Sequence, residues 1–442
     1  MSHSPILGRG KWEAYDFGHV FTACSRVKTV VTTPIHIENP ERWRPNLNGV
    51  LGAIFILACM NPWTSFGTNS MDSQPWPLLT GLVFLGSTRF VRAPPYIGPL
   101  SISITAGLII SIALSVNPTL TEILRAIAGY STLIVVYFAF YNYLLRFGFP
   151  SSLLFFSAVS WLVFAFVEMV SPSIISMFAA QRTSVGRGLT SLAPEPTFFA
   201  IFLLFLSWII FVGRNYQPSR REVFLIAANL LAIFLLARST MVIVYIAVAA
   251  VIYSGFFVIK SIGSLRMRGS HIFAVMFALI SMPFAKLLIE AFLEDTRTGR
   301  LMSTLSQKGL LAIISSDASI INRIEGSVLS IHAALYNKLI PGGLDTYLTT
   351  KELVRPFWGK IFWYPTVSNK ILSWNGVLLY ELGVFGLMAF VWLVLAAVRK
   401  GSASGAEIVI FAMFAMGAIP MAFPLIPMLF AVWAYNGKRM SA

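Results

Sequence analysis

The sequence predicts an all-α fold, a polytopic membrane bundle of about twelve transmembrane helices. Only 12% of the 442 residues are charged and 57% are hydrophobic, whereas ordinary soluble domains carry about 25% charged residues. Apolar runs recur along the chain, and several reach the roughly 20 residues that a helix needs to cross a bilayer. Lys and Arg gather in alternate connections. Soluble globular folds are therefore excluded.

The predicted transmembrane region covers residues 46–436, after a polar, basic extension over 1–45 and before a short tail over 437–442. The extension has no apolar core followed by a cleavage site, so we expect it to stay in the cytosol, either lying on anionic lipid or as a partly disordered tail. The predicted spans are 47–61, 76–88, 96–115, 123–145, 151–172, 196–213, 222–237, 239–259, 271–291, 375–397, 406–419 and 421–436. The last two, on either side of Pro420, could instead form one kinked helix.

Charge in the short connections sets the orientation, because Lys and Arg stay on the cytosolic side. The connections expected in the cytosol contain Arg89, Arg92, Arg146, Arg214, Arg220, Arg221, Lys260, Arg266, Arg268, Arg399, Lys400, Lys438 and Arg439. Residues 61–75 and 116–122 contain neither Lys nor Arg and are expected outside. Both termini are then cytosolic. Two outer loops, 173–195 and 292–373, contain basic residues, and we expect the second, of about 82 residues, to form a helical, basic extracytoplasmic lobe.

The net charge of +15 comes from the Lys and Arg of the cytosolic connections and of the extracytoplasmic lobe. Membrane lipid is therefore an expected partner and nucleic acid is not. The two cysteines, Cys24 and Cys59, give no basis for a disulfide framework or a zinc site. The sequence has no Asp-x-Asp pair, His-x-x-x-His helix or Walker loop. We therefore expect no metal and no cofactor, and any energy must come with the substrate.

The first candidate site lies where the outer loop 173–195 meets an apolar helix that begins at Pro196. Glu195 precedes this proline at the positive end of the helix. It could be an incidental carboxylate beside a capped helix, or a proton acceptor held opposite Arg187. Arg182 lies in the same loop.

Arg238 is predicted in a tight outer turn between two apolar helices. It could simply extend to the membrane surface. Alternatively it binds an anion, since the planar guanidinium fork suits a pyrophosphate.

Residues 320–339 have apolar residues at three-four spacing, which indicates an amphipathic helix on the membrane or on the bundle. Arg323 is predicted on the face away from the apolar stripe, with Ser327 and Ser330, whereas His332 flanks the stripe on the other side. His332 is therefore either a packing residue or an alternative proton acceptor. Three acids predicted within or beside membrane spans are further functional candidates: Glu168, Glu290 and Glu381.

Four motifs, in this order, resemble the O-antigen polymerase (Wzy) and O-antigen ligase (WaaL) superfamily. They are Arg187-Gly followed by Pro-Glu195-Pro196-Thr-Phe-Phe-Ala, Ala-Arg238-Ser, Asn-Arg323-Ile followed by Ile-Pro341-Gly342-Gly343, and Tyr-Glu381-Leu-Gly383-Val-Phe-Gly386-Leu. The resemblance implies a fold like that of the GT-C glycosyltransferases. It also implies transfer from an undecaprenyl-pyrophosphate-linked oligosaccharide to a sugar hydroxyl, at the outer face of the bacterial inner membrane.

By the same resemblance, Arg187, Arg238 and Arg323 would hold the pyrophosphate. Arg182 and Glu381 are further candidates for binding the substrate, and Glu195 is the preferred base, with His332 second. A ligase-type His-Asn is absent, since the chain reads Leu372-Ser373-Trp374-Asn375. This difference favours a polymerase, with a polysaccharide chain-length regulator as a possible partner, over a ligase. A lipid-linked sugar flippase is the alternative from another class, but no internal repeat supports it.

Overall fold

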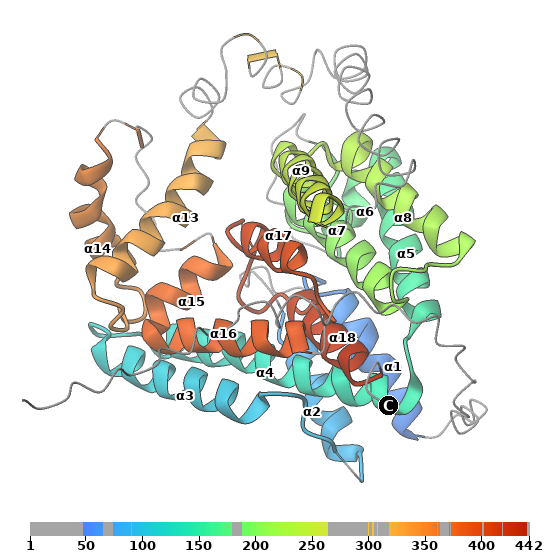
Figure 1. Cartoon of the computed structure of the whole chain (residues 1–442), viewed down its shortest axis with the longest axis horizontal. Helices are drawn as coiled ribbons and strands as arrows, with labels where there is room; N and C mark the ends of the chain where they lie inside the picture. The colour runs from blue at the N-terminus through green and yellow to red at the C-terminus, as the bar shows by residue number, and fades with distance from the viewer. Residues whose placement is uncertain are drawn as a thin grey trace, which may run out of the picture. The chain divides into compact units, whose positions relative to one another are not determined.

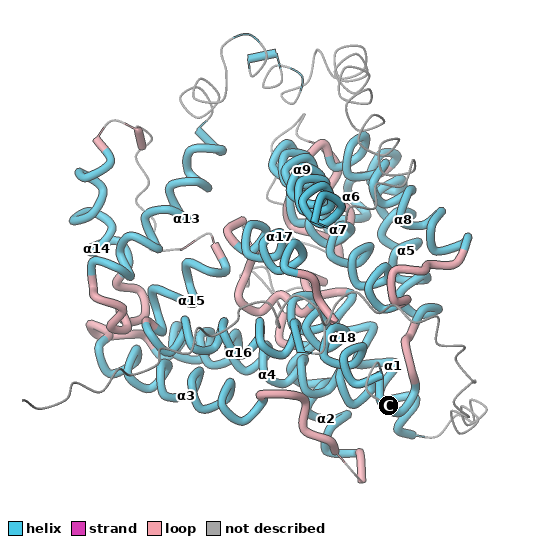
Figure 2. The backbone as a smooth tube through the Cα atoms, viewed as in Figure 1, coloured by secondary structure: helices cyan, strands magenta, loops and turns pink. Residues whose placement is uncertain are grey.

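The computed structural model describes residues 47–64, 74–89, 91–178, 188–263, 299, 303–304, 307, 318–359, 361–362, 371, 373–399, 402–417 and 419–439. The chain divides into two units, residues 1–44 and 45–442, and the described residues belong to the second. All regular secondary structure in these ranges is helical (Figure 1; Figure 2). The predicted all-α class is confirmed for this part of the chain.

Figure 1 shows the helices of both halves of the chain. Those of the N-terminal half are α1 (Leu47–Met60), α2 (Trp76–Ser87), α3 (Ile97–Leu114), α4 (Leu120–Phe147), α5 (Ser151–Val170), α6 (Pro172–Ser176), α7 (Pro196–Gly213), α8 (Arg220–Ala232), the π-helix η3 (Ile233–Ala237) and α9 (Thr240–Gly263). The C-terminal half contains α13 (Ala318–Tyr336), α14 (Tyr347–Val354), the 3₁₀-helix η4 (Arg355–Trp358), α15 (Trp374–Leu382), α16 (Val384–Val398), α17 (Gly405–Ala415) and α18 (Leu425–Arg439).

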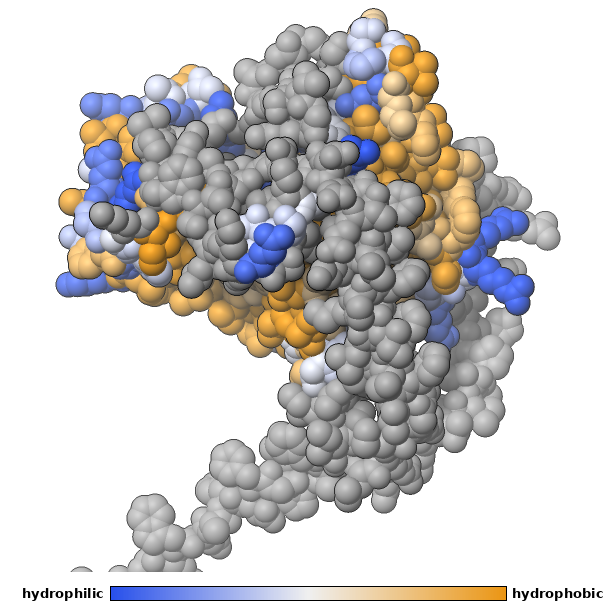
Figure 3. All heavy atoms as spheres, turned by 90° about the horizontal axis from the view of Figure 1, so that it is seen from above, coloured by the Kyte–Doolittle hydropathy of each residue, from blue (hydrophilic) through white to orange (hydrophobic). Residues whose placement is uncertain are grey.

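Apolar helices dominate this arrangement. Among the described residues, α3, α4, α5 and α7 are long and apolar enough to cross a membrane, and α1, α2, α16, α17 and residues 240–256 of α9 are shorter apolar helices. Figure 3 shows wide areas of hydrophobic residues on the surface between patches of hydrophilic ones. These features indicate a helical membrane protein. The number of twelve spans stays a prediction, and span 271–291 lies outside the described residues.

The predicted span 375–397 is two helices, which separate at Gly383. Gly383 has φ +57°, and a Cβ atom there would run into the carbonyl of Leu339. The chain is held in this bend because Val384 N donates to Leu339 O at 2.7 Å. The break therefore comes from a contact with a distant segment. Around Pro420 the structure also has two separate helices, α17 and α18, and not one kinked helix.

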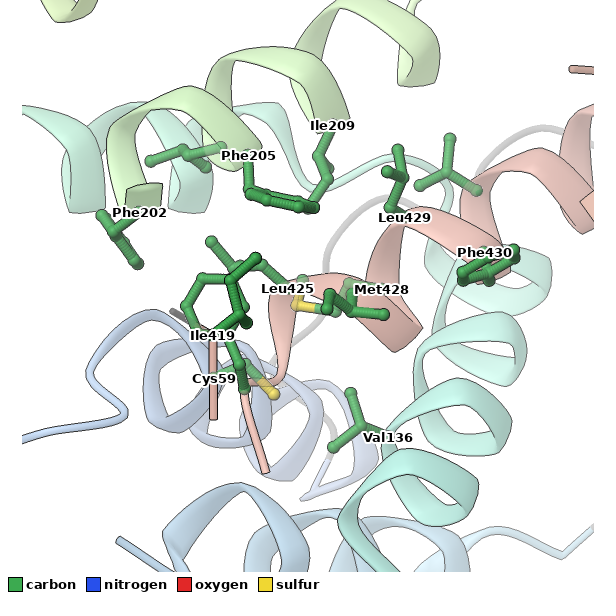
Figure 4. Close-up of a cluster of buried hydrophobic side chains, with 14 of the residues drawn as sticks. Cys59, Val136, Phe202, Phe205, Ile209, Ile419, Leu425, Met428, Leu429 and Phe430 are labelled. Carbon is green, nitrogen blue, oxygen red and sulfur yellow. The ribbon is translucent and has the colours of Figure 1, made fainter. Parts of the chain in front are cut away.

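The main core lies where α18 packs against α4 and α7 (Figure 4). Helix α7 is the most enclosed of the four long apolar helices, with 72% of its apolar stretch buried against 33–44% for the others. Aromatic rings fill the contact between α5 and α7, where the centroids of Trp161 and Phe202 are 4.1 Å apart. Such close packing is the main source of helix association in lipid. The start of α7 is therefore firmly placed.

The connections expected in the cytosol gather at one end of the bundle. Tyr216, between α7 and α8, donates to Glu407 of α17 at 2.9 Å. Asn436 of α18 donates to the carbonyl of Val212 at the end of α7, at 2.8 Å. Arg214 pairs with Glu222 here at 2.7 Å. Segments from both halves of the chain therefore share this end.

The connections expected outside also meet one another. The ring of Trp63, after α1, lies 5.6 Å from that of Phe423 and 5.5 Å from that of Phe198. Ser115, after α3, accepts a hydrogen bond from the backbone N–H of Leu344 at 2.6 Å. Connections that the charge pattern predicted on one side of the membrane therefore contact one another in the structure. Which end faces the cytosol stays a prediction.

We expect a cysteine at Thr349, an exposed position on α14, to react with a membrane-impermeant thiol reagent in intact cells whose outer barrier has been opened. A cysteine at Arg220, exposed at the other end, should react only after the membrane is permeabilised. Arg220 serves better than its neighbour Ser219, which caps α8. Cys24 and Cys59 are first replaced by serine. Labelling of Arg220→Cys but not Thr349→Cys in intact cells would invert the orientation and place the site described below in the cytosol.

Candidate functional site

Glu195 begins the candidate site at the N-terminal end of α7. Its backbone is extended, with φ −142° and ψ 151°, and Pro196 is the first helical residue, as predicted. The Glu195 carbonyl accepts the N–H of Phe199 at 3.2 Å. Its carboxylate makes no cap hydrogen bond and is 31% exposed. The backbone of Glu195 therefore fixes the helix start while its side chain points to another partner.

That partner is Arg323 of α13. Arg323 Nη2 lies 3.6 Å from Glu195 Oε2 and donates to Thr197 Oγ1 at 3.1 Å. Its Nη1 donates to the sulfur of Met241 on α9 at 3.2 Å. The structure therefore brings together two residues that the sequence singled out separately, at the junction of α7, α9 and α13. We call Glu195, Thr197, Met241 and Arg323 the Glu195–Arg323 site.

The geometry of this site suits an incoming anion. The Arg323 side chain is 21% exposed, so it can be reached from solvent. A thioether sulfur is a weak acceptor, and an anionic oxygen would replace Met241 at Nη1 with a stronger, charge-assisted hydrogen bond. Glu195 would then lie beside an anion bound to Arg323, where a carboxylate can accept a proton.

Glu168 of α5 anchors the segment that leads to Glu195. Its buried carboxylate accepts the N–H groups of Thr190 at 2.8 Å and of Ser191 at 2.6 Å, and the Thr190 hydroxyl at 3.0 Å. Ser191 Oγ in turn donates to the carbonyl of Trp161 at 2.7 Å. Glu168 was a functional candidate because acids in lipid are costly, and the structure gives it a positioning role.

Arg238 lies between η3 and α9 with a left-handed backbone, φ 47°. Its side chain is exposed, and its Nε donates to the carbonyl of Leu235 at 3.1 Å. Gly188, at the start of the Glu168-anchored segment, packs so closely on Ala237 that a Cβ atom would clash with the Ala237 carbonyl. Arg238 precedes Met241 by three residues, which puts their Cα atoms within about 11 Å. π-Helical turns and left-handed residues are enriched at functional sites.

Three candidates from the sequence lie outside the described residues. They are Arg182, Arg187 and Glu290.

His332 lies on the opposite side of α13 from Arg323, because nine residues of an α-helix turn the chain through two and a half turns. Its Nδ1 accepts from Trp358 Nε1 at 2.9 Å, and its ring lies 5.6 Å from that of Phe357. The structure therefore does not bring His332 to the Glu195–Arg323 site. Its contacts are those of a packing residue.

A buried ionic cluster on the same side of α13 attaches α14. Glu325 is fully buried, with Lys351 Nζ at 3.2 Å and Arg355 Nε at 3.7 Å. Tyr347 lies in the same contact, and its burial, followed by the charge of Glu325, raises the pKa of its hydroxyl. The partners of Glu325 could not be predicted from the sequence, because Lys351 and Arg355 are more than twenty residues away along the chain.

The other side of α13 faces the bundle. Ser327 Oγ donates to the carbonyl of Met416, and Ser330 Oγ lies 3.5 Å from Ser373 Oγ at the start of α15. The face that the sequence assigned to Arg323, Ser327 and Ser330 is thus turned inward. These contacts fix the rotation of α13 and aim Arg323 at α7.

Glu381 lies near the C-terminal end of α15. Its Oε2 accepts the hydroxyl of Tyr130 on α4 at 2.8 Å. In the part of the chain that the structure describes, no contact joins Glu381 to Glu195 or Arg323, so the structure does not bring Glu381 into the Glu195–Arg323 site.

The geometry thus supports one compact site and leaves two sequence candidates elsewhere. Comparison with models of known protein families and with characterised proteins gives no match for this chain.

Proposed function

We propose that the chain is a polysaccharide polymerase that joins oligosaccharide repeat units carried on undecaprenyl pyrophosphate, at the outer face of the bacterial inner membrane. The observation that carries the proposal is the partly exposed Glu195–Arg323 pair at the start of a deeply packed helix. A bundle of about twelve spans with a GT-C-like fold would place this pair at the outer membrane surface. The resemblance of the surrounding motifs supports the same activity.

The proposed reaction needs a leaving-group clamp and a proton acceptor. A hydroxyl of the acceptor glycan attacks the anomeric carbon of the donor, and the bond from that carbon to the pyrophosphate oxygen breaks. The products are a longer lipid-linked glycan and undecaprenyl pyrophosphate. Arg323, with Arg238 and Arg187, stabilises the charge that develops on the pyrophosphate. Glu195 takes the proton of the attacking hydroxyl.

A polymerase fits better than a ligase at the start of α15. The chain reads Leu372-Ser373-Trp374-Asn375 there and lacks the His-Asn of a ligase-type sequence. Ser373 Oγ accepts the N–H of Gly376 at 2.9 Å and lies against Ser330. The position therefore serves to cap α15 and to pack α13.

We expect purified protein in detergent to extend lipid-linked repeat units into longer glycans without a nucleotide, because cleavage of the bond between the glycan and its pyrophosphate supplies the energy. Chain length is read by mass spectrometry of the lipid-linked products. Growth in detergent also distinguishes this proposal from a flippase, whose activity needs a sealed compartment. If the protein moves lipid-linked units across the membrane of vesicles but never lengthens them, the polymerase is rejected in favour of a flippase.

Chain growth should continue in excess EDTA, because the proposed reaction uses guanidinium groups where many glycosyltransferases use a metal ion. The measurement is the initial rate of growth with and without EDTA, with a metal-dependent glycosyltransferase as positive control. Loss of growth that Mg²⁺ or Mn²⁺ restores would demonstrate a metal site and contradict the mechanism.

A further inference from the structure

An apolar groove of about 490 Å³ lies between α1, α2 and α5. Its walls include Leu57 and Ala58 of α1, Trp76 of α2 and Phe164 of α5. Ligand pockets in proteins range over roughly 300–1,000 Å³, so the groove has the size of a binding site. It takes no part in the contacts described so far.

One wall of the groove belongs to the segment that leads to the Glu195–Arg323 site. Leu192 lines the groove and is three residues before Glu195, a reach of at most about 11 Å. Phe164, which also lines the groove, lies one helical turn before Glu168, whose carboxylate holds Thr190 and Ser191. A molecule in the groove would therefore lie beside an anchored path to Glu195.

The groove is open on a side that suits a hydrocarbon chain. Ile54, Leu57 and Trp76 line it and are 46%, 42% and 41% exposed. They belong to apolar helices, so in a membrane this side faces the lipid chains. Thr64 adds a polar group to the lining, and its Oγ1 is buried with no hydrogen-bond partner within the part of the chain that the structure describes. A hydrocarbon chain has no hydrogen-bonding atom, so a partner for this hydroxyl would come from water or from the polar end of a ligand.

We propose that this groove binds the polyprenyl chain of the lipid-linked donor next to its pyrophosphate, so that the headgroup is delivered to Arg323. The inference rests on the proposed function, because the groove would hold the lipid part of the same substrate. A long isoprenoid chain fits the groove's apolar walls and its open side. Its pyrophosphate end would emerge beside Leu192 and the segment held by Glu168.

The first test narrows the groove and compares two donors that carry the same glycan pyrophosphate, one on an undecaprenyl chain and one on a two-isoprene chain. Ala58→Phe should raise KM for the undecaprenyl donor about three- to tenfold and leave KM for the short donor and kcat unchanged. The effect is modest because the polyprenyl chain enters the groove from detergent and not from water, so the variant loses only packing contacts with it. Leu57→Trp, at an exposed wall position, is a second variant should Ala58→Phe fail to fold. The matched control is Val50→Phe, exposed on the same helix but outside the groove lining.

Equal effects of the groove variants and Val50→Phe, or equal effects on both donors, would overturn the proposal. A second measurement needs no turnover. An undecaprenyl monophosphate probe with a diazirine in its chain should cross-link to residues 54–64, and Ala58→Phe or Leu57→Trp should prevent this. Cross-linking without any chain growth would reject the polymerase but keep the groove, whereas growth without cross-linking would reject the groove alone. Equal labelling by a diazirine phospholipid would make the groove a general lipid contact and contradict the proposal.

Discussion

Replacing Arg323 by lysine should reduce the initial rate of chain growth by about 10²- to 10³-fold, although the charge is kept. Arg323 contacts Glu195, Thr197 and Met241 through its two terminal nitrogens, and one ammonium group cannot reproduce that fork. Loss of a preorganised donor to a developing anion costs roughly 3 to 4 kcal/mol of transition-state stabilisation. The rate is measured on equally expressed, detergent-stable protein.

Arg214→Lys is the matched control for this variant. Arg214 also pairs with a glutamate, Glu222 at 2.7 Å, but at the opposite end of the bundle. We expect its chain growth to stay close to that of the unaltered protein, because partly exposed ion pairs contribute little. If Arg323→Lys behaves like Arg214→Lys, Arg323 only reaches toward the membrane surface, and the pyrophosphate clamp is rejected for this residue. Arg238→Lys and Arg187→Lys extend the test to the other two arginines.

Glu195→Gln should abolish turnover and leave binding of the lipid-linked donor intact. Glutamine keeps the shape of the side chain beside Pro196 and can still contact Arg323, but it cannot accept the acceptor's proton. General base catalysis contributes typically about 10²- to 10⁴-fold, so the loss should be visible in single-turnover chain growth. Binding is measured separately, with fluorescent lipid-linked donor.

The control is Glu352→Gln, an exposed carboxylate on α14 in the same predicted outer lobe. Near-normal growth of Glu195→Gln would reject Glu195 as the base and move the role to His332. In that case His332→Gln must show the loss instead. We expect no such loss for His332→Gln, because His332 packs against Phe357 and accepts a hydrogen bond from Trp358 at 2.9 Å.

The apolar helices in the described part of the chain could be predicted because lipid as solvent demands long apolar runs with few charges. The start of α7 at Pro196 and the amphipathic helix α13 follow from local patterns alone. The break at Gly383 could not be predicted from periodicity, because its neighbours Leu382 and Val384 are apolar and the bend depends on a hydrogen bond to Leu339. The periodicity of apolar residues reports local structure and cannot reveal a contact with a distant segment.

The candidate site was only half visible in the sequence. Arg323 and Glu195 were each conspicuous, as an arginine on a polar helix face and a carboxylate before an N-terminal proline, but they are 128 residues apart. Nothing local could join them. Glu168 was noticed as a costly acid in lipid, yet its partners Thr190 and Ser191 belong to a loop whose path depends on the fold.

The proposed polymerase is tested most directly by the composition of lipid-linked glycans in a bacterial strain that lacks this protein, complemented with the unaltered chain or with Glu195→Gln. We expect single repeat units to accumulate on the lipid carrier in the deletion strain and with Glu195→Gln. The unaltered chain should restore long glycans. Full-length chains that remain on the carrier in the deletion strain would contradict the polymerase and indicate a ligase.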